Sequence, residues 1–260
     1  MLRFSANLSM LYPDLPFLDR FAAAAGDGFK GVEYLGPYDC EPTEIAALLK
    51  THGLKQVLFN LPSGDWAGGE RGIGCLPDRR DEFRQGVEKA LVYARELDCP
   101  QVNCLAGIAP NGSDRAALED VLVENLRHAA PKFAAAGIKL LIEPINSYDI
   151  PGFLLNTSAD GERILERVGS DNLFIQYDFY HMQRMQGELV ATFQRLQDKI
   201  AHVQIADNPG RNEPGTGEIN YRFIFAELVR LRYDGWVGAE YKPKGQTSAG
   251  LAWLAAAATL

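Results

Sequence analysis

The chain has 260 residues, of which 47% are hydrophobic and 23% charged, a composition typical of a soluble globular protein. This length suits either one α/β barrel or two ordinary domains. The formal net charge of −8 argues against nucleic acid or an anionic membrane as a partner, because both call for a basic face. This net charge does not exclude a small anionic substrate.

The cysteines and the N-terminal segment predict the compartment. No two cysteines have CxxC spacing, and each falls in or beside an apolar segment, which is typical of buried free thiols in a reducing compartment. The N-terminal segment lacks the apolar region of a signal peptide, and no run approaches the roughly 18 apolar residues of a membrane span. We therefore expect a cytoplasmic protein without a membrane partner. The cysteines are Cys40, Cys75, Cys99 and Cys104.

Short apolar runs alternate along the chain with longer segments of helical period, a pattern typical of parallel βαβ units. The expected strands cover residues 3–7, 31–35, 56–61, 101–105, 140–143, 173–178, 200–207 and 236–241. The expected helices cover residues 17–25, 42–51, 81–97, 115–136, 158 or 160 to 168, 183–197, 221–231 and 248–258. Eight strand–helix units predict one (β/α)8 TIM-barrel domain over residues 1–260. An eight-stranded doubly wound sheet is the alternative.

Two long connections interrupt this alternation. Residues 62–80 contain five glycines together with Trp66 and Arg71, which favours a loop that covers the substrate. Residues 208–218 are dense in turn-forming residues. Both loops would lie next to strand ends.

Polar residues close or nearly close the expected strands. In a TIM barrel the C-terminal strand ends carry the chemistry, so these residues are candidates for one shared site. For the three asparagines among them, a role as the first loop residue is an equally good interpretation. The residues are Asn7, Glu33, Asn60, Asn103, Glu143, Asp178, Gln204 and Glu240.

A metal ion would relieve the repulsion between several carboxylates at one barrel mouth. We predict that Glu143, Asp178, Gln204 and Glu240 converge on one divalent cation. Because these ligands are all oxygens, Mg²⁺ or Mn²⁺ is favoured over Zn²⁺. The alternative is that the acids form salt bridges with a cationic side chain, for which the candidates are Lys139, Arg211 and Lys242.

A metal with open positions could chelate the oxygens of an α-hydroxy carbonyl compound and acidify the neighbouring C–H. One carboxylate would then remove that proton and another would return it to the adjacent carbon. Glu143 and Glu240, from the fifth and eighth strands, are the expected acid/base pair.

Several further side chains are candidates for substrate binding. His181 follows the sixth strand by three residues, in the expected loop, whereas His202 lies within a strand and is expected to be structural. Lys242, Arg71 and Arg211 could hold a substrate carboxylate, although for each residue taken alone a solvated surface charge is the favoured interpretation. Trp66, Asn7 and Asn60 complete the candidate set.

Several segments of the chain, spread nearly from end to end, resemble the hydroxypyruvate isomerase family, a branch of the xylose isomerase-like TIM barrels. The resemblance implies interconversion of hydroxypyruvate and 2-hydroxy-3-oxopropanoate, with residues matching Glu143 and Glu240 as the acid/base pair. It also implies a divalent metal on the residues matching Glu143, Asp178, Gln204 and Glu240. The segments are residues 4–10, 60–67, 69–72, 142–146, 175–178, 180–183, 202–207, 213–221 and 240–243.

The resemblance also defines the alternatives. Many ketose epimerases of the superfamily carry His where this chain has Gln204, which favours the isomerase branch. A sister group isomerises 2-oxo-tetronate, which is longer by one hydroxymethylene group. A phosphodiesterase resembling the apurinic endonucleases would need several histidines and a basic groove, and a non-catalytic binding barrel is the third alternative. The expected partner is a small hydroxy-keto acid, and the sequence leaves open whether the chain forms a homo-oligomer.

Overall fold

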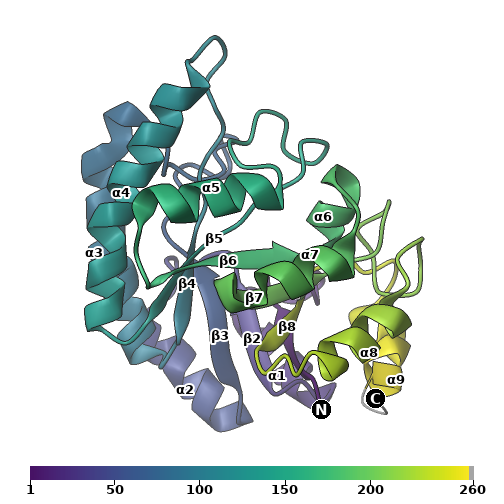
Figure 1. The fold of residues 1–260 in the computed structure, drawn as a ribbon. Coiled ribbons are helices and arrows are strands. Elements are labelled where there is room, and N and C mark those ends of the chain that lie inside the picture. Colours follow the sequence, from purple (N-terminus) through teal and green to yellow (C-terminus); the bar gives the residue numbers. More distant parts are fainter. Residues whose placement is uncertain (258–260) are drawn as a thin grey trace.

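The computed structural model, described here for residues 1–257, is a closed barrel of eight parallel strands that follow one another in chain order (Figure 1). This confirms the predicted (β/α)8 fold. Hydrogen bonding between the first and last strands closes the barrel, with Ser5 opposite Gly238. The strands are β1 Arg3–Asn7, β2 Gly31–Tyr34, β3 Lys55–Asn60, β4 Gln101–Cys104, β5 Lys139–Ile142, β6 Leu173–Asp178, β7 Ile200–Ile205 and β8 Trp236–Ala239.

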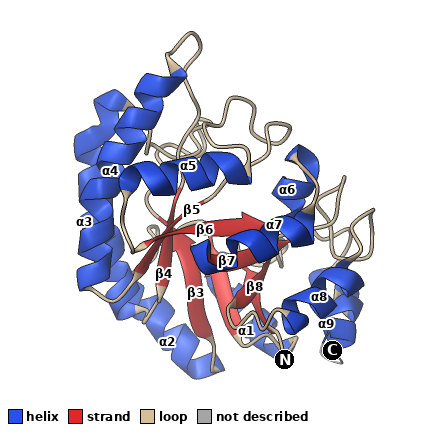
Figure 2. Cartoon of the chain, in the orientation of Figure 1, coloured by secondary structure: helices blue, strands red, loops and turns tan. Residues whose placement is uncertain are grey.

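Helices surround the strands on the outside of the barrel (Figure 2). Within the described residues, none is both long and apolar enough to cross a bilayer. The α-helices are α1 Arg20–Gly26, α2 Pro42–His52, α3 Arg80–Glu96, α4 Arg115–Ala135, α5 Ser158–Val168, α6 Phe179–Met185, α7 Leu189–Leu196, α8 Tyr221–Arg230 and α9 Ala252–Ala257. Short 3₁₀ turns are η1 Phe17–Asp19, η2 Pro77–Arg79, η3 Gln197–Lys199 and η4 Thr247–Gly250.

The expected helix over residues 183–197 is wrong, because two helices take its place. The Asp178 side chain accepts a hydrogen bond from the Tyr180 N–H at 2.8 Å and starts α6 directly after β6. Gly187, in the left-handed conformation, then separates α6 from α7. His181 therefore lies in a helix, not in the expected loop.

The last helix also differs from its expected range. The segment begins with η4 and continues as α9, which starts at Ala252 instead of residue 248. The expected end at Ala258 lies outside the described residues. Trp253 of α9 packs edge-on against Phe4 of β1, with 5.3 Å between the ring centroids, so this helix covers the closing point of the barrel.

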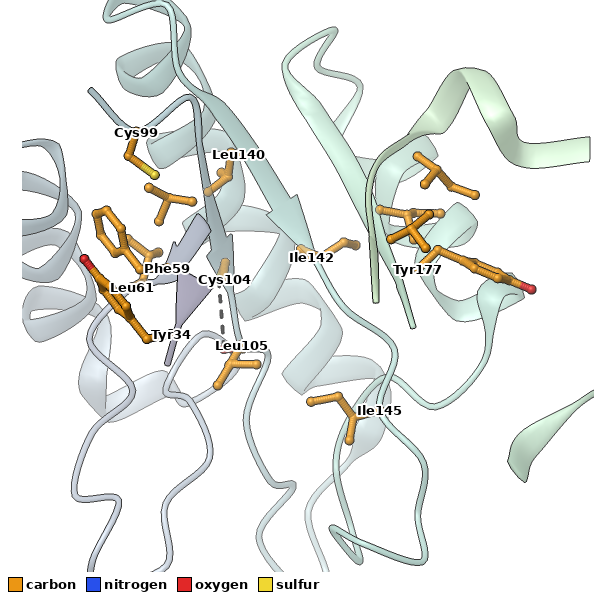
Figure 3. Packing of buried hydrophobic residues seen from close by; sticks show 14 of the residues in the cluster. Tyr34, Phe59, Leu61, Cys99, Cys104, Leu105, Leu140, Ile142, Ile145 and Tyr177 are labelled. Carbon is orange, nitrogen blue, oxygen red and sulfur yellow. Dashed lines mark hydrogen bonds between the residues drawn. The ribbon is translucent and has the colours of Figure 1, made fainter. Parts of the chain in front are cut away.

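Two apolar clusters form the core. The larger one lies between strands and helices, and Figure 3 shows part of it, including Leu140 and Ile142 of β5. The smaller one contains Leu141, which alternates with these two residues and therefore points into the barrel. Its other buried members are Val57 and Leu58. Apolar packing thus fills part of the barrel interior, and polar side chains occupy the rest.

Candidate active site

A cavity of about 520 Å³ opens at the C-terminal ends of the strands. Its volume is in the usual range for a small-molecule site, and this end of a TIM barrel is where active sites form. Asp178 and Gln204 are fully buried and contact residues that line it. Nine predicted site residues line the cavity itself: Asn7, Asn60, Trp66, Arg71, Glu143, His181, Arg211, Glu240 and Lys242.

Glu143, Asp178 and His181 form a buried group that we call the acid–histidine group. His181 Nε2 lies 3.7 Å from Glu143 Oε1 and 3.6 Å from Asp178 Oδ2. Neither carboxylate oxygen has a hydrogen-bond partner among the described residues. The three donor atoms lie within 4.8 Å of one another, and unpaired buried oxygens suit a divalent cation. These residues therefore fit a metal ion.

The other two members of the predicted ligand set are engaged with each other. Gln204 Nε2 donates to Glu240 Oε2 and, at 2.7 Å, to Glu33 Oε1. Gln204 Oε1 accepts from Gln176 Nε2 at 2.6 Å. The carbonyl oxygen that would bind a metal thus already has a partner in this arrangement. The four-ligand set stays a prediction, with Glu143 and Asp178 close together and His181 beside them.

Arg211 provides positive charge inside the cavity. Its Nη2 lies 2.7 Å from Glu240 Oε1, and its Nη1 lies 3.3 Å from Asp149 Oδ2. The alternative interpretation of the acids as salt-bridge partners therefore holds for Glu240 with Arg211. Arg211 has a φ of 54°, a left-handed conformation that is uncommon for a non-glycine residue. Its carbonyl accepts the Lys242 N–H at 2.7 Å, which ties the β7–α8 loop to the segment after β8.

A fourth buried carboxylate, Glu33, lies next to Gln204 and Asn7. It accepts from Ser5 Oγ at 2.7 Å and lies 2.9 Å from His202 Nε2. Asn7 Nδ2 connects it to the site, since this amide donates to Glu240 Oε2 at 3.0 Å and contacts Glu33 Oε1 at 3.4 Å. A Cβ on Gly238 would lie 2.3 Å from the Glu33 carboxylate, so only glycine leaves room for it.

The rim of the cavity carries the remaining candidates. The Arg71 guanidinium lies over the Trp66 ring, 4.1 Å from its centroid, and donates to two carbonyls of the same loop. Lys242 is exposed. Deeper in the cavity, Asn103 Nδ2 donates to Asn60 Oδ1 at 3.1 Å and contacts Glu143 Oε2 at 3.4 Å. Asn60 therefore reaches Glu143 through Asn103.

Burial of like charges raises the pKa of Glu143, Asp178 and Glu240. Burial, together with Glu240 and Asp178, raises the pKa of Glu143 well above its usual value. Burial also raises the pKa of Glu240 to about 8 and that of Asp178 to about 6, although Arg211 opposes both shifts. The pKa of His181 is lowered by burial and by Arg211, which keeps the ring neutral. Near neutral pH, Glu143 and Glu240 therefore favour their protonated forms.

Sequence reasoning missed three polar contributors. Gln176 and Asp149 line the cavity, and Asn146 contacts His181 Nδ1 at 2.6 Å. The signal for Asn146 was its position three residues after Glu143, in a loop of the expected active-site face. Gln176 lies inside β6, two residues before Asp178, so its side chain points to the same inner face of the barrel. This alternation was the signal that could have identified it.

Three comparisons place the chain among known proteins. The model of the family described as xylose isomerase-like TIM barrel matches residues 21–257. Hydroxypyruvate isomerase of Escherichia coli strain K12 is 53% identical over 254 residues, 98% of each chain. A 2-oxo-tetronate isomerase of Cupriavidus necator is 48% identical over 98% of each chain.

A solved structure shares the fold closely. It is described as an AP endonuclease of family 2 from Brucella melitensis, and it superposes with a TM-score of 0.96 at 46% sequence identity. The match covers 98% of this chain and 99% of the other. The whole barrel, including the described loops around the cavity, therefore has a close structural counterpart.

We predict that Glu240 makes the folded state less stable as the pH rises. In the unfolded chain its carboxyl loses a proton near its ordinary pKa, whereas the folded protein keeps that proton until about pH 8. Stability should therefore fall from about pH 5 to pH 8. Glu240→Gln mimics the protonated form, so the melting temperature of this variant should fall less over that range. Asp178 contributes to the fall in both proteins.

The melting temperatures of both proteins would be measured by differential scanning calorimetry with a chelator present. Equal falls in the two proteins would contradict the raised pKa of Glu240.

Proposed function

Because this chain belongs to the xylose isomerase-like TIM barrel family, we propose that it interconverts hydroxypyruvate and 2-hydroxy-3-oxopropanoate. Its relatives at 53% and 48% identity are named as isomerases of hydroxypyruvate and of 2-oxo-tetronate, so the chain is an isomerase. The observation that carries the proposal is the pair of buried glutamates at the ends of β5 and β8, both on one cavity and both with raised pKa.

The reaction needs one proton transfer between adjacent carbons. A carboxylate removes a proton from C3 of hydroxypyruvate, which gives an enediolate, and a carboxylic acid delivers a proton to C2. The hydroxyl proton on C3 is lost and the C2 oxygen gains one, so the product is an isomer. Glu143 and Glu240 suit these two roles because repulsion between them opposes ionisation of both at once, so one stays protonated as the acid while the other acts as the base.

The charge on the enediolate and the carboxylate of the substrate both need positive partners. Arg211 reaches into the cavity beside Glu240 and His181, where the reacting oxygens would lie. Lys242 and Arg71 line the rim and would attract the substrate carboxylate, and Trp66 supports Arg71 through its ring. Asn7, at the end of β1, and Asn60, at the end of β3, contribute amide groups to the cavity wall. These cations favour a 2-oxo acid over a neutral sugar.

A divalent cation fits the acid–histidine group, where Glu143 Oε1 and Asp178 Oδ2 have no partner among the described residues. Glu240 and Gln204 would join as ligands if the Gln204 amide turned its oxygen towards the site. When bound, Mg²⁺ or Mn²⁺ would polarise the substrate carbonyl and replace the protons that the acids otherwise hold.

Two other activities are alternatives to isomerisation of hydroxypyruvate. The first is isomerisation of 2-oxo-tetronate, the activity for which a relative at 48% identity is named. The cavity volume is large enough for the additional carbon of that substrate. The description of the Brucella melitensis structure raises phosphodiester hydrolysis on DNA as a candidate. An acid-lined cavity, with one histidine in the acid–histidine group and a net charge of −8, suits a DNA backbone poorly.

The test compares substrates. We expect the purified protein with Mg²⁺ to isomerise hydroxypyruvate with a higher kcat/KM than 2-oxo-tetronate, followed by proton NMR. Higher kcat/KM on 2-oxo-tetronate would change the substrate and leave the chemistry, whereas cleavage of abasic DNA without any isomerisation would contradict the proposal.

We predict that Glu143→Gln and Glu240→Gln each lower kcat by at least about 10², because each removes an acid/base group. Circular dichroism should show that both variants fold. Glu218→Gln, which changes an exposed acid in the β7–α8 loop, serves as the control and should retain activity. Turnover near the wild-type value in either site variant would remove that glutamate from the mechanism.

We predict that exhaustive chelation abolishes turnover and that Mg²⁺ or Mn²⁺ restores it. Titration calorimetry should show that Asp178→Asn weakens Mg²⁺ binding by at least about tenfold, because one anionic ligand is lost. Asparagine retains an oxygen that can accept the Tyr180 N–H, so α6 should persist. Full activity in a verified metal-free sample would contradict a role for the metal.

A further inference from the structure

The Asn146 side chain has a fixed orientation. Its Oδ1 accepts the backbone N–H groups of Tyr148 at 3.0 Å and Asp149 at 2.8 Å. The amide nitrogen must therefore point the other way, and it lies 2.6 Å from His181 Nδ1. Rotating the amide by 180° would place an NH₂ group against two N–H donors. Both residues are buried, with exposures of 0% and 1%.

An NH₂ group at this distance requires an acceptor, so His181 Nδ1 carries a lone pair and no proton. A neutral imidazole with a free Nδ1 has its proton on Nε2. We propose that Asn146 is a positioning residue that fixes His181 as the Nε2–H tautomer, which makes His181 a hydrogen-bond donor to the substrate and not a metal ligand. The role towards substrate rests on the proposed isomerase function, whereas the position of the proton does not.

The surroundings of His181 Nε2 suit a donor. The nitrogen faces two carboxylate oxygens, Glu143 Oε1 at 3.7 Å and Asp178 Oδ2 at 3.6 Å, and neither is close enough to accept a strong hydrogen bond. Arg211 Nη2, a second donor, lies 3.5 Å away. Two donors side by side at the cavity wall can bind one substrate oxygen, and the charge on that oxygen grows as the enediolate forms.

The same geometry removes His181 from the metal site. A histidine ligand binds a metal through an unprotonated nitrogen, and its other nitrogen usually donates to an acceptor. Here the nitrogen that faces the carboxylates carries the proton, and the other nitrogen accepts. The carboxylates of Glu143 and Asp178 would therefore hold a cation without the imidazole, although the three residues lie together.

The test uses ¹⁵N NMR of protein labelled at histidine. The His181 signals are assigned by their loss in His181→Gln. We expect Nδ1 to appear unprotonated and Nε2 protonated, both without metal and after addition of Mg²⁺. A protonated Nδ1, or loss of the Nε2 proton when Mg²⁺ binds, would overturn the proposal. This measurement needs no turnover, so it is independent of the proposed function.

Two variants separate the tautomer from the structure of the loop. Asn146→Asp retains an oxygen for the Tyr148 and Asp149 N–H groups but presents an acceptor to Nδ1, which should move the proton onto Nδ1. Asn146→Ala removes both interactions. We expect kcat to fall by about 10² or more in Asn146→Asp, with a smaller fall in Asn146→Ala, where both tautomers are populated.

Asn220→Asp provides a control with the same change of side chain. The exposed Asn220 caps α8, and its Oδ1 accepts the Phe223 N–H at 3.1 Å, an interaction that aspartate retains. This control should leave the His181 signals and most of kcat unchanged. If Asn146→Asp keeps the wild-type tautomer and kcat while Asn146→Ala loses activity, Asn146 merely supports the loop and the proposal fails.

Discussion

Electrostatic repulsion at the barrel mouth is the constraint on which the other features depend. Glu143, Asp178 and Glu240 are buried together, and the Arg211 guanidinium is the cation that attracts all three. One cation cannot balance three carboxylates in a poorly solvated cavity, so protons or a divalent ion must supply the rest. The raised pKa of the two glutamates and the unpaired oxygens of the acid–histidine group are two signs of the same imbalance. The proposed proton transfer between adjacent carbons would use acids in this state.

A layer of buried polar side chains around Glu33 keeps these acids in place. Burial opposes ionisation of Glu33, but His202, Gln204 and Ser5 outweigh it, so the pKa of Glu33 is lowered and this acid stays charged. Its charge orients the Gln204 amide, which in turn bonds to Glu240. Barrel interiors of this fold are usually filled by branched apolar side chains, and here the polar layer replaces them near the mouth. The barrel interior near the mouth therefore belongs to the candidate active site.

The sequence predicted the parts of the site that topology alone determines. All eight parallel strands end on one face, so Glu143, Asp178 and Glu240 had to lie near one another once the strand–helix alternation was recognised. Strand order does not determine loop contacts. The bond from Asn146 to His181 depends on a turn after β5 and on an early helix start after β6. The prediction for residues 183–197 followed helical periodicity and did not consider the Asp178 cap or the break at Gly187. The amide network likewise depends on side-chain orientation.

The backbone link between the two last loops has a consequence for how this barrel could evolve. The Lys242 N–H donates to the Arg211 carbonyl, and Asn212 Nδ2 donates to the Lys242 carbonyl. These hydrogen bonds fix the position of Arg211, inside the cavity, relative to that of Lys242 at its rim. Insertions in either loop would displace both side chains, so new substrate preferences should arise by joint replacement of these loops. Substitution of Arg71 is less constrained, because its hydrogen bonds lie within its own loop.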